Sequence, residues 1–373
     1  MKVLFIVQGE GRGHLTQAIS MAQILRRSGH EITGVLVGKS EHRTLPAFFE
    51  KKIRAKVSCF RSPNFLPAPA NKGIHLGKSI LHNLFQTGEF IESIRFIRSE
   101  IRESGADLVI NFYDLLAGIT YSLFKPEVPL VCIAHQYVFL HPDYPFPDEN
   151  IFSLYLLRLF TRVTAPGASR KLALSIHEME PVTEKNLVTV PPLLREELFD
   201  LIPEKGDYLH GYLLNSGFRE ELEEWHEGAS HEKVHVFWDK EERSSSDGNL
   251  HFHALDDEAF LRYMAGCKGY VTTAGFESVC EALYLEKPVF MVPTHIEQAC
   301  NAHHGALCGI GMNADNFRLE GFERFSRQYR PEPRYKGWIK SGPGVILKEM
   351  EQQFHTVCQN EDFIKMPQVA AQT

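Results

Sequence analysis

Long hydrophobic runs are missing from this sequence of 373 residues. No stretch approaches the ~18–20 consecutive apolar residues that a membrane-spanning helix needs. The apolar run at residues 2–7 is short and is not followed by a small-residue cleavage site, so it indicates a first β-strand rather than a signal peptide. These absences argue against an integral membrane protein and against a secreted one.

Paired cysteines are missing as well. The seven cysteines are an odd number, and none of them forms a Cys-x-x-Cys motif. Several lie in apolar runs, which indicates buried thiols in a reducing compartment. We therefore expect a cytoplasmic protein.

Charge is distributed unevenly along the chain. The net charge is −7, yet residues 1–60 carry ten Lys and Arg against four Asp and Glu, a local excess of six positive charges. Such a patch fits a solvated face, an anionic acceptor, or peripheral contact with the inner face of a membrane, and the solvated face is the simplest of the three. Nucleic acid is not expected as a partner, because no recognition motif accompanies the charge.

The composition, with 43% hydrophobic and 23% charged residues, is that of a globular protein. At 373 residues the chain is longer than a domain with a single hydrophobic core usually is, which suggests two domains. We place the linker at about residues 191–206, because Pro191 and Pro192 cannot lie inside a helix. The predicted segments are a first domain at residues 1–192, a second at residues 205–345, and a C-terminal helix and tail at residues 346–373 that pack back on the first domain.

The first domain opens with a strand at residues 2–7, a glycine-rich loop, a helix, and a second strand at residues 31–37. This order is that of a Rossmann-type unit. A dinucleotide site would need an acidic residue at the end of the second strand, where Gly38-Lys39 stands instead, so NAD is not expected. A similar unit begins at residues 208–214, and we therefore predict an α/β protein with two Rossmann-like domains facing across a cleft.

Polar residues follow two strands of the first domain. Asp114 comes after an apolar strand at residues 107–112, and His135 and Gln136 come after the next one at residues 129–134. Because ligands bind at the carboxyl ends of parallel strands, we expect these side chains on the rim of one cleft.

Residues 268–301 organise the second domain as strand, turn, helix, strand and loop. The helix begins near Gly275, so its unpaired N–H groups favour a phosphate above the sheet. Glu277 and Glu281 lie one turn apart on this helix and repel each other. At least one of them therefore needs a ligand or a cationic partner, unless both are solvated.

Three segments resemble the GT-B glycosyltransferases, in particular the branch with the MurG transferases and the UDP-glucuronosyl and plant glucosyl transferases. They are the loop Gly-Glu-Gly-Arg-Gly-His at residues 9–14, the segment at residues 273–281, and the Glu-Gln-x-x-Asn-Ala segment that ends at residue 302. The resemblance spans nearly the whole chain and implies the GT-B fold.

The resemblance implies a nucleotide-sugar donor site on the second domain. Glu281 would accept hydrogen bonds from the ribose hydroxyls, a charge-assisted contact. Gly275 and Ser278 would meet the diphosphate, and Glu297 and Gln298 would hold the sugar. The other donor-binding residues that it implies are Ser216 and Gly217, on the phosphate side, and His253, beside the base.

The resemblance also implies a catalytic base. His14, at the start of the first helix, would take the proton of the acceptor hydroxyl, and histidine suits this role because its pKa is near neutral. Asp114 is the candidate that would orient it; binding of phosphate or capping of backbone by His14 is the alternative. The residues expected to line the acceptor side of the cleft are Gly11, Gly13, His135, Gln136 and Glu277.

Neither a cofactor nor a metal is expected. No cysteine or carboxylate completes a ligand set with His251, His253, His303 and His304, and such transferases stabilise the leaving diphosphate with helix dipoles and side chains. The prediction is an inverting, metal-independent glycosyltransferase with a nucleotide-diphosphate sugar donor, expected to be a UDP-sugar, and an unknown hydroxyl acceptor, lipid-linked or small. A nucleotide-sugar 2-epimerase of the same fold, which would need several acids around the sugar, and a non-catalytic nucleotide-sugar-binding protein stay open as alternatives.

Overall fold

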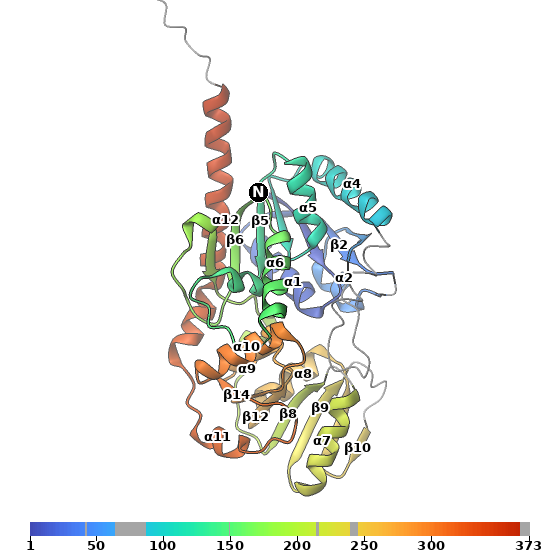
Figure 1. Cartoon of the computed structure of the whole chain (residues 1–373), viewed down its shortest axis with the longest axis vertical. Coiled ribbons are helices and arrows are strands. Elements are labelled where there is room, and N and C mark those ends of the chain that lie inside the picture. Colours follow the sequence, from blue (N-terminus) through green and yellow to red (C-terminus); the bar gives the residue numbers. More distant parts are fainter. Residues whose placement is uncertain (42, 64–86, 149, 214–215, 239–244, 366–373) are drawn as a thin grey trace, which may run out of the picture.

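The computed structural model describes residues 1–41, 43–63, 87–148, 150–213, 216–238 and 245–365. Its helices and strands form two α/β units, one above the other in Figure 1. Within these residues, no helix combines the length and the apolarity that crossing a membrane requires. The cysteines whose side chains are described are free thiols, and four of them, Cys132, Cys267, Cys280 and Cys300, are buried as expected, whereas Cys59 and Cys308 are exposed.

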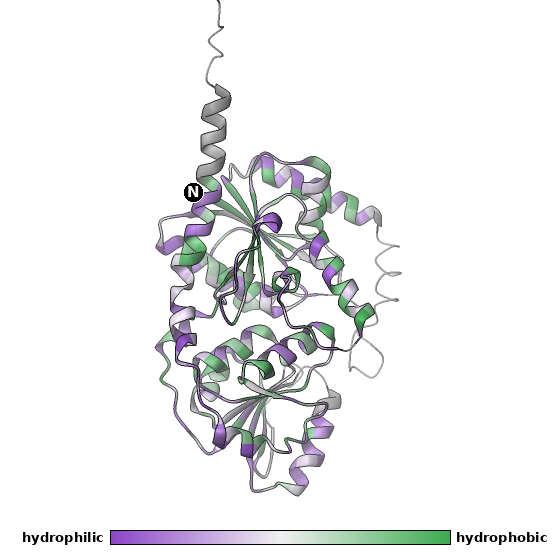
Figure 2. Ribbon diagram, turned by 60° about the vertical axis from the view of Figure 1, so that its left-hand side comes forward, coloured by the Kyte–Doolittle hydropathy of each residue, from purple (hydrophilic) through white to green (hydrophobic). Residues whose placement is uncertain are grey.

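The first unit is built on a parallel sheet with the strand order β3-β2-β1-β4-β5-β6-β7. Its strands are β1 (Lys2–Gln8), β2 (Glu31–Lys39), β3 (Val57–Arg61), β4 (Leu108–Phe112), β5 (Leu130–Ala134), β6 (Ala168–Leu174) and β7 (Leu187–Val190). The centre of β1, from Val3 to Val7, is fully buried, because helices cover both faces of a parallel sheet. Figure 2 shows the strands of this unit largely in the green of hydrophobic residues. The strand order reverses between β1 and β4, and such a switch point is where open sheets bind ligands.

The second unit repeats this plan with the order β10-β11-β9-β8-β12-β13-β14. Its strands are β8 (Tyr208–Leu213), β9 (Lys233–Trp238), β10 (Ser245–Asp247), β11 (Leu250–Ala254), β12 (Gly269–Thr272), β13 (Val289–Met291) and β14 (Gly311–Asn313). All described pairs are parallel except β10 with β11. The order reverses between β8 and β12, which gives this unit its own switch point.

Helices lie on both sides of each sheet (Figure 1). In the first unit they are α1 (Arg12–Arg27), α2 (Ala47–Ile53), α4 (Thr87–Glu103), α5 (Leu115–Phe124), the 3-10 helix η2 (His135–Leu140) and α6 (Ile151–Val163). In the second they are α7 (Ser216–Gly228), α8 (Asp257–Gly266), α9 (Phe276–Tyr284), α10 (Ile296–Leu307) and α11 (Phe322–Gln328). This architecture confirms the predicted α/β class with two Rossmann-like units.

The last helix differs from its prediction. The sequence predicted a helix only from about residue 345, whereas α12 runs over Pro333–Lys365 with Pro343 inside it. It contacts both units: the hydroxyl of Tyr335 donates to the carbonyl of Cys280 (3.2 Å), and Trp338 Nε1 donates to the carbonyl of Ser175 (2.9 Å). Packing against both units therefore outweighs the helix-breaking tendency of Pro343.

Candidate active site

A cavity of about 340 Å³ lies between the two units. Its walls come from the β1–α1 loop with Gly11 and Gly13, from the β12–α9 turn with Gly275 and Ser278, and from Arg195 in the connection between the units. Both loops follow strands at the switch points of their sheets. The two sheets therefore share one site.

Two helices begin at this cavity. Gly11 and Gly275, the N-caps of α1 and α9, have extended backbone and make no side-chain cap. The turn before α9 is tight because Ala274 takes a left-handed conformation with φ of 63°, and Asn301 Nδ2 donates to its carbonyl at 3.2 Å. The first N–H groups of a helix have no intrahelical partner, so both helix ends favour an anion in the cavity.

His14 lies in the first turn of α1, beside Gly13. Its ring is buried and stacks on Tyr113, with ring centroids 5.4 Å apart. Tyr113 directly follows β4 and has a left-handed backbone conformation with φ of 64°. Strained backbone of this kind is concentrated at functional sites. Burial lowers the pKa of His14, although the carboxylates of Glu277 and Glu297 oppose this shift. The imidazole is therefore neutral near pH 7, as a general base must be.

Gln17, one helical turn after His14, fixes the orientation of that imidazole. Its Nε2 donates to the carboxylate of Glu277 on the other unit, so its oxygen faces His14 Nδ1 at 3.2 Å. This arrangement places the proton of the neutral ring on Nδ1 and leaves the lone pair on Nε2. The sequence reasoning missed Gln17, although its spacing of three residues from His14 puts both on one helix face.

The prediction that Asp114 orients His14 is wrong. Asp114 is fully buried at the N-terminus of α5, where its carboxylate accepts hydrogen bonds from the amides of Leu116 (2.9 Å) and Ala117 (3.1 Å) and from Ser62 Oγ (2.8 Å). Burial raises its pKa to about 6 despite these donors. Asp114 thus acts as a helix N-cap.

Glu297, from the first turn of α10, reaches the first unit. Its Oε1 accepts a hydrogen bond from Gln136 Nε2 at 3.2 Å and lies 3.2 Å from His135 Nε2. Burial alone would raise its pKa, but the imidazoles of His135, His295 and His14 outweigh burial and lower it to about 2. Glu297 is therefore ionised at any physiological pH.

Gln136 is one of the polar residues around His14. Its Nε2 lies 3.5 Å from His14 Nε2. His135 in turn stacks on Phe276 of the other unit, with ring centroids 4.6 Å apart and planes 7° apart. The predicted acceptor-side residues His135, Gln136 and Glu277 are thus brought together around His14.

Glu281, the implied ribose ligand, forms a bidentate ion pair with Arg195. The guanidinium Nε and NH2 donate to its two carboxylate oxygens, both at 2.6 Å. The carboxylate is 2% exposed and the guanidinium side chain 14%. The sequence predicted a ligand or a cationic partner for at least one acid of this helix, and Arg195 is the cationic partner of Glu281.

Asp257, at the start of α8, joins this ion pair to the first unit. It lies 3.9 Å from Arg195 NH1 and accepts a hydrogen bond from Arg12 NH2 at 2.8 Å. Arg12 belongs to the β1–α1 junction. A line of alternating charges therefore runs from one unit to the other along the cavity wall.

The other implied donor residues divide into two groups. Gly275, Ser278 and Gln298 line the cavity, and Gln298 braces it by accepting from Thr294 Oγ1 (2.7 Å) and donating to Thr273 Oγ1 (3.3 Å). Ser216 and Gly217 open α7, but their side chains lie outside what the structure describes.

His253 does not line the cavity. It lies on β11, and its Nε2 is 2.9 Å from His235 Nδ1 on β9. Leu255, just after the end of β11, is the residue of this segment that lines the cavity. His253 instead belongs to a group of histidines that includes the fully buried His210.

This histidine group predicts acid sensitivity. Burial, and then the positive charge of neighbouring imidazoles, lowers the pKa of His210 to about 3 and that of His235 to about 4. As pH falls from about 6.5 towards 4, the unfolded chain binds protons that the folded one does not, so the free energy of unfolding decreases by about 1.4 kcal/mol per pH unit for each such proton. His210→Phe should flatten this slope in urea unfolding measured between pH 4 and 7. His231→Phe, at an 82% exposed side chain, should leave it unchanged, and an unchanged slope in His210→Phe would contradict the assignment.

The sequence model of glycosyl transferase family 1 matches residues 1–328. No curated protein matches the chain by sequence. Among solved structures, Phytolacca americana UGT2, complexed with UDP-2fluoro-glucose and pterostilbene, aligns with a TM-score of 0.63 and 12% identity over 95% of this chain and 99% of its own.

Two further structures are similar over most of both chains. CalG4, the calicheamicin glycosyltransferase, has a TM-score of 0.59 and 17% identity, over 94% of this chain and 97% of its own. The spinosyn rhamnosyltransferase SpnG, complexed with thymidine diphosphate, has a TM-score of 0.59 and 13% identity, over 94% of this chain and 100% of its own. These neighbours share the GT-B fold, and the family match covers most of the chain; the protein therefore belongs to glycosyl transferase family 1 and is a glycosyltransferase.

Proposed function

We propose that this glycosyltransferase moves a sugar from a nucleoside-diphosphate donor to a hydroxyl of an acceptor, with inversion at the anomeric carbon and without a catalytic metal. The observation that carries this proposal is the neutral His14. Its Nδ1 faces Gln17, which is itself bonded to Glu277. Its Nε2 lone pair faces the amide of Gln136 across 3.5 Å, a contact that an acceptor hydroxyl would replace. A base of this kind removes the proton of the acceptor hydroxyl as the oxygen attacks.

The placement of the groups supports the proposed inversion. His14 belongs to the first unit, whereas the N-terminus of α9, where the diphosphate would lie, belongs to the second. A hydroxyl activated by His14 would attack the anomeric carbon on the face opposite the leaving diphosphate. One such displacement inverts the configuration.

The leaving diphosphate would be stabilised by the protein itself. The amides at the start of α9 and the guanidinium groups of Arg12, Arg43 and Arg195 line the cavity. Helix N-termini and cations stabilise the charge that develops on a leaving group. This arrangement supports transfer without a metal ion.

The solved neighbours support the choice of ligands to test. LpCGTa was solved with UDP, and SpnG with thymidine diphosphate. Arabidopsis thaliana UGT89C1 was solved with UDP-L-rhamnose and with quercetin. We therefore propose UDP or thymidine diphosphate as the nucleotide, with UDP first, and a small hydroxyl compound or a lipid-linked one as the acceptor.

Thermal unfolding with UDP, thymidine diphosphate, GDP and NAD tests the donor site. A ligand at 100 times its dissociation constant adds about 2.7 kcal/mol, which raises Tm by several degrees in domains of this size. We expect such a shift with one nucleoside diphosphate and none with NAD.

A matched pair of variants assigns the shift to the site. Ser278→Val, at the start of α9, should weaken the shift, whereas Glu220→Gln, at an exposed position of α7, should not. A shift with NAD alone, or none with any nucleotide or UDP-sugar, would contradict the proposed donor.

A further inference from the structure

Away from the donor cavity, three metal-binding side chains converge between the units. They are His177, just after β6 of the first unit, and His304 and Cys308 on the last turns of α10. Their ligand atoms lie within 4.8 Å of one another. The rings of His177 and His304 meet edge to face, with centroids 5.0 Å apart.

His304 and Cys308 are placed on α10 so that both can bind the same ion. His304 and Cys308 are four residues apart, so both side chains lie on one face of the helix. The sequence reasoning found no cysteine to complete a set with His304, although Cys308 follows it by one helical turn; the third side chain, His177, approaches only through the fold. Among the residues that the structure describes, these three form a group of metal-ligating side chains whose ligand atoms lie close enough together to be candidates for one ion.

We propose that His177, His304 and Cys308 bind a thiophilic divalent cation, of which Zn²⁺ is the best match. Two imidazoles and a thiolate are preferred ligands of this ion, at about 2.0–2.1 Å for nitrogen and about 2.3 Å for sulfur. A tetrahedral ion with these bonds holds its ligand atoms roughly 3.5 Å apart. The three ligand atoms, now within 4.8 Å of one another, would have to approach to that separation by side-chain rotation when the ion binds. Mg²⁺ and Ca²⁺ prefer oxygen ligands and do not fit.

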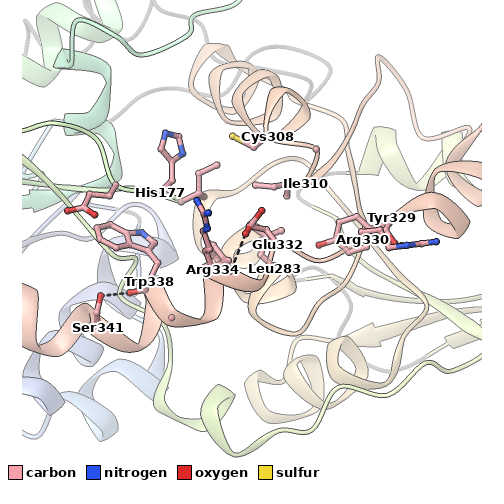
Figure 3. A pocket seen from close by; sticks show the side chains of 15 residues that line it. His177, Leu283, Cys308, Ile310, Tyr329, Arg330, Glu332, Arg334, Trp338 and Ser341 are labelled. Atoms are coloured by element: carbon pink, nitrogen blue, oxygen red, sulfur yellow. Dashed lines mark hydrogen bonds between the residues drawn. The ribbon is translucent and has the colours of Figure 1, made fainter.

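The fourth position of the ion faces open space. A cavity of about 820 Å³ is lined by His177 and Cys308 and also by Glu178 and Glu332. Figure 3 shows His177 and Cys308 on the same side of this cavity. His177 and Cys308 are exposed while His304 is buried, so an ion can enter from solvent and keep a water molecule as its fourth ligand.

The cation has a structural role in this proposal. α10 carries Glu297 and Gln298 in its first turn, and Cys308 is the residue that caps its C-terminus. The helix is roughly 18 Å long. An ion shared with His177 ties the far end of this helix to the first unit. It thereby holds the position of Glu297 opposite His14 without taking part in sugar transfer.

Metal titration of the full chain, after treatment with a chelator, tests the site. Zn²⁺ in competition with a chromophoric chelator should bind with one equivalent per chain. Co²⁺ in place of Zn²⁺ should give a thiolate-to-cobalt absorption band in the near ultraviolet. Cys308→Ser should abolish that band and lower the Zn²⁺ affinity at least ten-fold, and His177→Ala should lower the affinity by a similar factor.

Two matched variants serve as controls. Cys59→Ser removes an exposed thiol elsewhere, and His303→Ala removes the histidine next to His304; both should retain the affinity and the band. His177 is exposed, so its replacement keeps the fold even if a change on α10 does not. Absence of stoichiometric binding, a band that survives in Cys308→Ser, or an unchanged affinity in His177→Ala would each overturn the proposal.

Discussion

His14→Ala is expected to lower the rate of sugar transfer by about 10²–10⁴-fold, the usual contribution of a general base. The donor should still bind, because the cavity walls are formed by other residues. Measurement of kcat/KM together with the nucleotide-induced thermal shift separates the two effects. His231→Ala, at an exposed histidine, should leave both unchanged.

The pH dependence gives the same test an independent readout. Burial lowers the pKa of His14 from 6.5, so the base is deprotonated above that lowered value and protonated only in more acidic solution. Wild-type kcat/KM should therefore stay level through neutrality and fall on acidification. The acid limb should be lost in His14→Ala; equal turnover by the variant and the wild type would remove His14 from the mechanism.

Gln17 and Asp114 can be distinguished as partners of this base. Gln17→Leu removes the acceptor of His14 Nδ1 and should reduce turnover by about five-fold, since one neutral hydrogen bond contributes about 1 kcal/mol. Asp114→Asn keeps an oxygen that can cap α5 and should behave as the wild type. The reverse result would restore the orienting role to Asp114.

Glu281→Leu is expected to destabilise the protein by about 3–5 kcal/mol, because it leaves the buried guanidinium of Arg195 without its partner. Arg195→Met should cost a similar amount by isolating the carboxylate. Urea unfolding of each variant measures these losses. Glu220→Ala, at an exposed position of α7, provides the control and should change the free energy of unfolding by less than about 0.5 kcal/mol.

The double variant Arg195→Met with Glu281→Leu separates stability from donor binding. Replacing a whole buried ion pair by apolar side chains is often neutral, so most of the lost stability should return. The nucleotide-induced thermal shift should nevertheless be absent, since the implied ribose ligand Glu281 is gone. If each single variant were as stable as the wild type, the pair would not be the buried one that the structure describes.

The core of the second unit was predictable from local patterns. The strand at residues 270–272, the helix at residues 276–285 and the strand at residues 289–292 correspond to β12, α9 and β13 within one or two residues. Continuous apolar runs bounded by Gly275 and Pro288 mark these elements. By contrast, Gly337, Gly342, Pro343 and Gly344 concealed the first half of α12, which forms because Tyr335 and Trp338 pack on both units.

The site was predictable only in part. His14, Glu277 and Glu297 lie within the motifs that carry the family resemblance, and the fold brings their side chains together. Asp114 was misread because an aspartate between a strand and a helix is equally a helix N-cap. Arg195 was missed because no spacing rule links residues 86 positions apart; only the packing of one unit on the other does so.

The two places where the chain crosses between the units lie next to each other. A single turn of α12, from Tyr335 to Trp338, bonds to both units, at Cys280 of α9 and at Ser175 just after β6. The other crossing passes next to it, since a methyl group added at Gly342 would lie 3.2 Å from Pro191. Away from these crossings, side chains such as Arg12 with Asp257 and Gln136 with Glu297 join the units. A ligand that enters between the units would have to displace contacts of this kind, whereas the adjacent crossings keep the units joined.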